Sequence, residues 1–287
     1  MKREIEELIH KEFLVGRLLG SGTAGEVYEV THKSNHYKYA MKVSEKKHIL
    51  RLEAEMMTKI QSKVFPQIFD YKEAELGYLI MECIEGKNLQ DMLDGGILFE
   101  MRESVWIVSA VLQGLDYLHK QMPAMVYRDL KPSNIIINTS GEVRLIDLGS
   151  VAYSGKSQES ESLRAGTYGY AAPEQFWPEM IPMPHWDVYA AGKLLGYLLT
   201  GHNPAIPPYD VEEYYKKDKK VPWAMKAVLN RSLSKQGQAR YADAELMLAE
   251  LQMALEETEK KKWYVSRENR DLEYKKCIWL SEYRRIF

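Results

Sequence analysis

Apolar and polar residues alternate along the first part of the chain. Residues 26–30 and 37–43 alternate in this way, and residues 67–71 and 78–83 are two further strand candidates. An alternating pattern puts every second side chain on the same face of a strand. We therefore expect residues 1–85 to fold mainly as a twisted antiparallel sheet.

One helix interrupts this sheet pattern. Between residues 46 and 61, the apolar residues Ile49, Leu52, Met56 and Ile60 recur every three or four positions. This spacing is typical of a single buried stripe on an amphipathic helix. We expect that stripe to hold the helix in the fold.

After residue 86 the remainder of the chain has helical spacing. Apolar stripes predict helices at residues 89–93, 105–119, 185–200, 222–232 and 242–257. A short glycine-containing segment, 85–88, would let the two parts hinge about a ligand-binding crevice. The predicted class is α+β, with a sheet lobe at 1–85, a mainly helical lobe at 86–257 and a C-terminal tail at 258–287.

Composition narrows the range of functions. The 287 residues include 39 Lys and Arg against 41 Asp and Glu, so the overall charge gives no reason to bind nucleic acid or an anionic membrane. The most apolar stretch, 105–118, is shorter than the roughly 18 residues that span a bilayer. Two cysteines, Cys83 and Cys277, are too few for a disulfide framework. We expect a cytoplasmic protein that recognises anions only locally.

Three glycines precede the predicted strand at 26–30. Gly20, Gly22 and Gly25 form the pattern G-x-G-x-x-G, and that strand begins immediately after them. Dinucleotide-binding folds use these glycines between a strand and a helix. A glycine flap between two strands instead lets the backbone approach nucleotide phosphates. An ordinary glycine hairpin is the alternative.

Lys42 is a charged residue among apolar neighbours in the predicted strand at 37–43. The helix that follows offers two acidic partners, Glu53 and Glu55, which project about 200 degrees apart around the helix axis. Only one of them can therefore face the sheet. We favour Glu53, because Met57 then lies one turn below it on the buried side.

Polar groups crowd two short turns further along the chain. Asp129, Lys131 and Asn134 precede the apolar run at 135–137, and Asp147 follows a second apolar run. Buried strands would hold these side chains at fixed positions. Asp129 can accept a hydroxyl proton, and Lys131 can neutralise a phosphoryl group in transfer. Asn134 and Asp147 supply the oxygen ligands that Mg²⁺ prefers.

In this order the motifs resemble those of the eukaryotic-type (Hanks-type) serine/threonine protein kinases, a family also widespread in bacteria. The resemblance runs from about residue 13 to residue 251 and implies Mg-ATP as cofactor, with Mn²⁺ as a substitute for Mg²⁺. The catalytic residues that it implies are Lys42, Glu53, Asp129 and Lys131, with Asn134 and Asp147 as metal ligands.

The resemblance also implies an adenine site. Met81 would guard the back of this site, Glu82 and Ile84 would offer backbone hydrogen bonds to adenine, and apolar side chains would sandwich the ring. The implied nucleotide-binding residues are Leu19, Gly20, Gly22, Gly25, Val27, Ala40, Lys42, Met81, Glu82, Ile84 and Ile136.

Residues 166–174 resemble the end of a kinase activation segment, which shapes a groove for a polypeptide and which small-molecule kinases generally lack. Thr167 together with Lys131 resembles the serine/threonine subclass, in which both residues contact Asp129. Two structural roles are also implied, namely pairing of Glu174 with Arg240 and support of the catalytic loop by Asp187.

Three positions depart from the family pattern. Tyr127 stands where histidine is usual, Leu148 where phenylalanine is usual, and Asn88 where a ribose-binding acid is usual. We expect Tyr127 and Leu148 to pack with Met57 in an interior stack between the lobes. Activity should therefore survive both replacements, although Leu148 bears on how easily the turn at Asp147 flips.

Two elements are candidates for regulation. A phosphoserine in the activation segment would bind Arg128 and order the segment, or a glutamate there already pairs with Arg128. The serines are Ser157, Ser160 and Ser162, and the glutamates are Glu159 and Glu161. In the tail, Trp279, Tyr283 and Phe287 share a helical face that either packs on the kinase or docks a regulatory partner.

The expected function is transfer of the γ-phosphate of Mg-ATP to serine or threonine of a protein substrate, with autophosphorylation. A pseudokinase scaffold that only binds nucleotide is one alternative, and a small-molecule kinase is another. The complete set of catalytic positions disfavours the scaffold, and residues 167–174 disfavour the small-molecule kinase.

Overall fold

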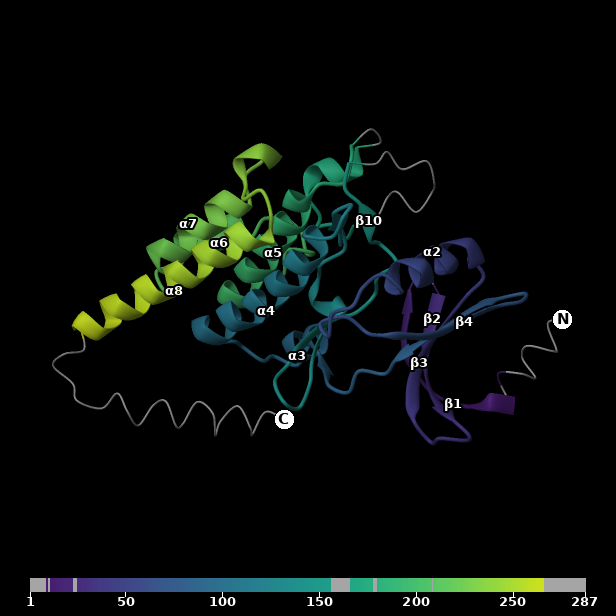
Figure 1. The fold of residues 1–287 in the computed structure, drawn as a ribbon. Coiled ribbons are helices and arrows are strands. Elements are labelled where there is room, and N and C mark those ends of the chain that lie inside the picture. The colour runs from purple at the N-terminus through teal and green to yellow at the C-terminus, as the bar shows by residue number, and fades with distance from the viewer. Residues whose placement is uncertain are drawn as a thin grey trace.

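The computed structural model describes residue 9 and residues 11–22, 25–155, 166–177, 180–207 and 209–265, the last five of these by their backbone only. A sheet with one helix forms the N-terminal part, and helices form most of the remainder (Figure 1). The α+β class with two structurally different parts is therefore confirmed.

The N-terminal part is one five-stranded antiparallel sheet with the strand order β1-β2-β3-β5-β4. Its strands are β1 (Phe13–Gly22), β2 (Gly25–His32), β3 (Lys38–Ser44), β4 (Ile68–Glu73) and β5 (Gly77–Glu82). Alternate side chains of β5 enter different clusters: Tyr78 and Ile80 pack with Met41, whereas Leu79 joins the main core. At β5 both faces of the sheet are thus covered, whereas β1 is exposed beyond Phe13.

Helix α2 (Lys47–Met57) packs on this sheet and ends four residues before the predicted end. Its buried side includes Leu50, Ala54 and Met57, which lie in the main core. The predicted stripe was wrong at Leu52, which is 49% exposed. Leu52 lies about 200 degrees around the helix from Leu50, so only one of the two leucines can face the core.

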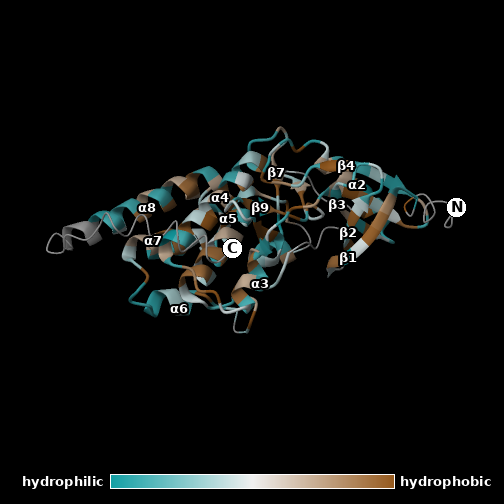
Figure 2. Ribbon diagram, turned by 90° about the horizontal axis from the view of Figure 1, so that it is seen from below, coloured by the Kyte–Doolittle hydropathy of each residue, from teal (hydrophilic) through white to brown (hydrophobic). Residues whose placement is uncertain are grey.

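The C-terminal part is built around two long helices. These are α4 (Met101–His119) and α5 (Pro184–Thr200), and α5 is buried along nearly its whole length. Apolar residues lie all around α5, as expected for a helix in the centre of a domain. The surrounding helices are α3 (Leu89–Asp94), α6 (Glu212–Lys217), α7 (Trp223–Ser232) and α8 (Ala244–Val265). Figure 2 shows the mixture of apolar and polar residues along α8, which packs on α4.

Five short strands hold the segments that carry the polar motifs. β7 (Met125–Val126) pairs with β10 (Ala152–Tyr153), and β8 (Ile135–Ile137) pairs with β9 (Val143–Leu145) and with β6 (Lys87–Asn88). The two apolar runs that flank the polar motifs are therefore strands, as predicted, and they pair with each other. Residues 127–134 connect β7 to β8, and Asp147 lies between β9 and β10, so both turns are anchored at each end.

Three helices differ from the prediction. Helix α4 begins at Met101, where Glu100 and Glu103 form a reciprocal capping box. Helix α6 was not predicted, because its sequence carries two Glu-Lys pairs at four-residue spacing in place of a clear apolar stripe. Helix α8 continues past residue 257, and the division at that residue stays a prediction. No helix among the described residues is both long and apolar enough to span a membrane.

Candidate active site

The ammonium group of Lys42 lies between two carboxylates from distant parts of the chain. Its Nζ is 2.8 and 3.0 Å from the two carboxylate oxygens of Glu53 on α2, and 3.0 Å from Oδ1 of Asp147. Glu55 is exposed. The prediction that Glu53 and not Glu55 pairs with Lys42 is therefore confirmed.

Burial and ion pairing shift the pKa values of this cluster in opposite directions. Burial alone would lower the pKa of Lys42, but Glu53 and Asp147 outweigh burial and raise it. Burial likewise favours protonation of Asp147, yet Lys42 and the N–H of Gly149 bring the pKa of Asp147 below its usual value. Lys42 is therefore a cation and Asp147 an anion at neutral pH. Burial raises the pKa of Glu53, and Lys42 offsets only part of that rise.

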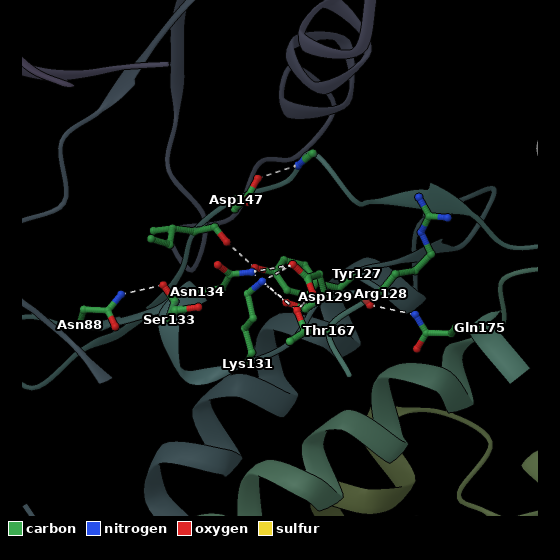
Figure 3. A network of polar contacts seen from close by, with 12 residues as sticks. Asn88, Tyr127, Arg128, Asp129, Lys131, Ser133, Asn134, Asp147, Thr167 and Gln175 are labelled. Atoms are coloured by element: carbon green, nitrogen blue, oxygen red, sulfur yellow. Dashed lines mark hydrogen bonds and ion pairs between the residues drawn. The ribbon is translucent and has the colours of Figure 1, made fainter. Parts of the chain in front are cut away.

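Asp129, Lys131 and Thr167 form a closed triangle (Figure 3). Thr167 Oγ1 donates to Asp129 Oδ1 at 2.8 Å, Lys131 Nζ lies 2.9 Å from Asp129 Oδ2, and Lys131 Nζ donates to Thr167 Oγ1 at 2.9 Å. The joint contact of Thr167 and Lys131 with Asp129, which the resemblance implied, is present. An acceptor hydroxyl beside this triangle would meet both a proton acceptor and a cation.

Asn134 and Asp147 each have one side-chain oxygen that accepts no hydrogen bond from the part of the chain that the structure describes. Asn134 donates its amide nitrogen to the backbone oxygen of Asp129 at 2.9 Å, which turns Oδ1 of Asn134 the other way. Asp147 uses Oδ1 for Lys42 and for the N–H of Gly149. The two remaining oxygens suit Mg²⁺, which keeps several waters and phosphate oxygens as ligands. No group of three or more His, Cys, Asp or Glu among the described residues could hold a metal by itself.

Asp187 supports the catalytic loop from inside α5. Its carboxylate accepts the backbone N–H groups of Tyr127 and Arg128, each at 2.8 Å, and the ring Nε2 of His119 at 3.0 Å. The side chain of Asp187 is fully buried. The predicted supporting role is confirmed, and His119 adds a link to α8 because its Nδ1 accepts the N–H of Ala244.

Two residues of the site have left-handed backbone conformations, which residues other than glycine rarely adopt. Arg128 has φ of 70° and Asp147 has φ of 65°. The conformation at Arg128 lets two successive N–H groups reach Asp187, and the hydroxyl of Tyr127 bonds the carbonyl just before Asp147. Backbone strain of this kind persists only where surrounding contacts fix it.

Comparison with known proteins agrees with this arrangement. A family model described as "Protein kinase domain" matches residues 13–247. The chain is 30% identical over 271 residues to "Serine/threonine-protein kinase PknL" of Mycobacterium tuberculosis, covering 87% of this chain and 67% of PknL. The chain belongs to the protein kinase family.

Two further kinases extend the comparison. "G protein-coupled receptor kinase 2" of Caenorhabditis elegans is 30% identical over 211 residues, which cover 69% of this chain and 29% of that kinase. "Aurora kinase" of Eremothecium gossypii is 30% identical over 222 residues, which cover 73% of this chain and 57% of that kinase. The chain thus spans only part of the length of these two kinases.

The departures from the kinase pattern have physical explanations. Met57, Tyr127 and Leu148 lie in one core cluster, as predicted. Asn88 accepts the N–H of Gln90 at the start of α3 and donates to the carbonyl of Ser133 at 2.6 Å. This asparagine therefore holds α3 against the catalytic loop.

The predicted nucleotide residues lie on neighbouring strands of the kinase. Val27 is opposite Lys42, and Ala40 is opposite Met81 in the antiparallel register. Ile136 is on β8, opposite Asn88. The other predicted positions are Leu19, Gly20 and Gly22 on β1, Gly25 on β2, Glu82 at the end of β5, and Ile84 just after it.

Sequence reasoning missed two residues that hold the site together. His119, the last residue of α4, is buried and bonds Asp187, a contact that the sequence did not indicate. Arg144 on β9 donates to Oε2 of Glu82 at 2.7 Å and so connects the end of β5 to the C-terminal part. The only signal for His119 was its position at the end of an apolar stripe, and Arg144 gave none.

Some predictions fall outside the described residues. They concern Ser157, Ser160, Ser162, Glu159 and Glu161 in the activation segment, and Cys277, Trp279, Tyr283 and Phe287 in the tail. The predicted pair of Glu174 and Arg240 does lie within the described residues and is confirmed, with two bonds of 2.7 and 3.0 Å.

Proposed function

We propose that this kinase transfers the γ-phosphate of Mg-ATP to serine or threonine hydroxyls of proteins, itself included. The observation that carries the proposal is the triangle of Asp129, Lys131 and Thr167. It combines a carboxylate, a cation and a hydroxyl from the activation segment at one point. The cytoplasmic location expected from the cysteines stays a prediction.

The nucleotide would lie between the glycine flap and β8. Lys42 would bind the α- and β-phosphates, and Glu53 would hold Lys42 in place. The N–H of Glu82 donates to the carbonyl of Gln67, so the backbone carbonyl is the group of Glu82 that we assign to adenine. Ile84 would supply the second backbone contact.

Asn134 and Asp147 would hold Mg²⁺ through their remaining oxygens. The metal ion would neutralise negative charge on the β- and γ-phosphates. Asp129 would orient the acceptor hydroxyl and take its proton as the bond from the acceptor oxygen to the γ-phosphorus forms. The bond from the γ-phosphorus to the β–γ bridging oxygen breaks and ADP leaves, while Lys131 stabilises charge on the transferring group. Positioning and charge neutralisation supply most of the catalysis in such a reaction.

Two observations argue against the alternatives. A scaffold that only binds nucleotide does not need Asp129 to contact both Lys131 and Thr167. Phosphoryl transfer therefore explains these contacts better than a scaffold function does. A small-molecule kinase would not need residues 166–174. The residue that follows them, Gln175, attaches this segment to the catalytic loop, because its amide nitrogen donates to the carbonyl of Arg128 at 2.9 Å.

Radiolabelled ATP tests the proposal with casein, histone and the chain itself as acceptors. Asp129→Asn keeps an oxygen that can accept from Thr167 but loses the base, and we expect it to lower kcat by about 10² to 10⁴-fold. Phosphoamino-acid analysis should find label on serine or threonine. Absence of label on every protein, or equal incorporation by wild type and Asp129→Asn, would contradict the proposal.

A further inference from the structure

Lys193 is a buried cation on α5 that the phosphoryl-transfer chemistry does not use. Its side chain is 5% exposed, and among the described residues no carboxylate lies within ion-pairing distance of it. Its Nζ donates to the backbone carbonyl of Tyr209 at 3.1 Å and lies 5.5 Å from the centre of the Tyr189 ring. Burial lowers the pKa of Lys193, and Asp210 and Glu212 offset only part of this.

A buried lysine with one carbonyl partner destabilises a fold relative to an apolar residue of similar size. Tyr209 adds a second unfavourable feature, since its φ of 62° is left-handed. The bond from Lys193 holds this strained residue in place. The buried cation of Lys193 and the strained backbone of Tyr209 both destabilise the fold. We therefore ask which part of the chain their contact holds in position.

The contact positions the connection from α5 to α6, whose described residues, 201–207 and 209–211, are called here the loop 201–211. This loop packs directly on residues 168–170. Gly169 has φ of 90°, and a Cβ there would lie 2.0 Å from the carbonyl oxygen of Pro204. Tyr170 donates its hydroxyl to Asn203 at 3.3 Å. The rings of Tyr168 and Tyr209 lie 6.5 Å apart, so the residue that Lys193 holds also touches the segment.

Residues 168–170 directly follow a residue of the candidate active site. Thr167, the residue before Tyr168, makes the bond to Asp129. Tyr168 is 67% exposed and stacks on Phe176 with ring centres 4.5 Å apart. A polypeptide whose hydroxyl reaches Asp129 must therefore pass close to Tyr168, whereas the proposed ATP site lies toward Lys42.

We propose that Lys193 is a positioning residue for protein substrates: through Tyr209 it fixes the loop 201–211 against residues 168–170 and so sets the surface that a polypeptide acceptor contacts. The inference rests on the proposed function, because it concerns the acceptor side of that reaction. Lys193 itself touches neither ATP nor the transferred phosphate.

The test compares Lys193→Met with Lys226→Met. Lys226 on α7 also donates to a single backbone carbonyl, that of Lys216 at 2.9 Å, but it lies outside the loop 201–211. We expect Lys193→Met to raise KM for the protein acceptor about tenfold. Its KM for ATP, measured by ATP hydrolysis without acceptor, and its kcat should stay within about twofold of wild type, and Lys226→Met should match wild type throughout.

Each outcome is decisive. An unchanged KM for the acceptor in a folded Lys193→Met protein, or an equal rise in both KM values, would overturn the inference. If Lys193→Met does not fold, Tyr209→Gly replaces it, because glycine suits the left-handed backbone and removes the ring that contacts Tyr168. The same selective rise is then expected, and its absence refutes the inference. A wild type that phosphorylates no protein refutes the proposed function instead.

Discussion

The phenolic hydroxyl of Tyr127 donates a hydrogen bond to the backbone carbonyl of Ile146. This bond joins the catalytic loop to the residue before Asp147. Tyr127 is fully buried, so the hydroxyl has no water to replace this partner.

Tyr127→Phe should therefore loosen the turn at Asp147 while the interior stack stays packed. We expect a loss of about 1 kcal/mol in unfolding free energy and a fall in kcat of about fivefold. Tyr215→Phe is the matched control, because it removes a bond of 3.0 Å to Asn230 from another buried tyrosine, far along the chain. A fall in kcat of similar size in Tyr215→Phe would show that lost stability alone explains the effect.

Glu174 and Arg240 form a buried ion pair whose arginine side chain is fully buried. Arg240→Met should destabilise the protein by about 3–5 kcal/mol, because it leaves the carboxylate of Glu174 without its cation. Glu174→Leu combined with Arg240→Met should recover part of that loss in urea unfolding. A double variant no more stable than Arg240→Met would contradict this explanation.

Gly25 closes the glycine flap against β3. Its φ is 131°, and a Cβ would lie 2.2 Å from the carbonyl oxygen of Val43. Gly25→Ala should therefore lower the unfolding free energy by about 2 kcal/mol or more and raise KM for ATP. Gly20→Ala is the control for stability, since its Cβ would meet no atom within 4 Å. Equal stability of the two variants would contradict the prediction.

His185 links pH to stability. Burial lowers the pKa of His185, and the nearby Arg240 lowers it further, while Glu174 opposes them. The unfolded chain therefore binds a proton at His185 at a higher pH than the folded chain does. Unfolding free energy should fall as pH drops from about 7 through 6.5, until the folded-state pKa is passed.

Urea unfolding between pH 7.5 and 5.5 measures this effect. His185→Gln should flatten the pH dependence of stability, whereas the same change at the exposed His48 should leave it as in wild type. A wild-type slope that persists in His185→Gln would mean that other groups cause it.

Much of the site was predictable because its residues are close together in the sequence. Asp129, Lys131 and Asn134 lie within six positions, and the strands around them are short and apolar. The choice of Glu53 over Glu55 followed from helix geometry together with the position of Met57 one turn below Glu53. These inferences need only the local backbone and the directions of side chains.

Other features depended on contacts between distant residues. His119 and Asp187 are 68 positions apart, and Arg144 and Glu82 are 62 apart, so no local pattern could pair them. Periodicity predicted α2 but chose Leu52 over Leu50, because both leucines fit an apolar spacing and only the core decides between them. Helix α6 was not predicted, because its stability depends on charge pairs and on packing against α5.

The hydrogen bond from Ala244 to His119 limits how far the chain can be shortened in the laboratory. A fragment that stops before α8 would leave Nδ1 of His119 without its donor, and His119 in turn orients Asp187 beneath the catalytic loop. It would also uncover the apolar surface that Met247 and Leu251 bury. Expression fragments intended for assays or crystals should therefore retain this helix at least through Leu251.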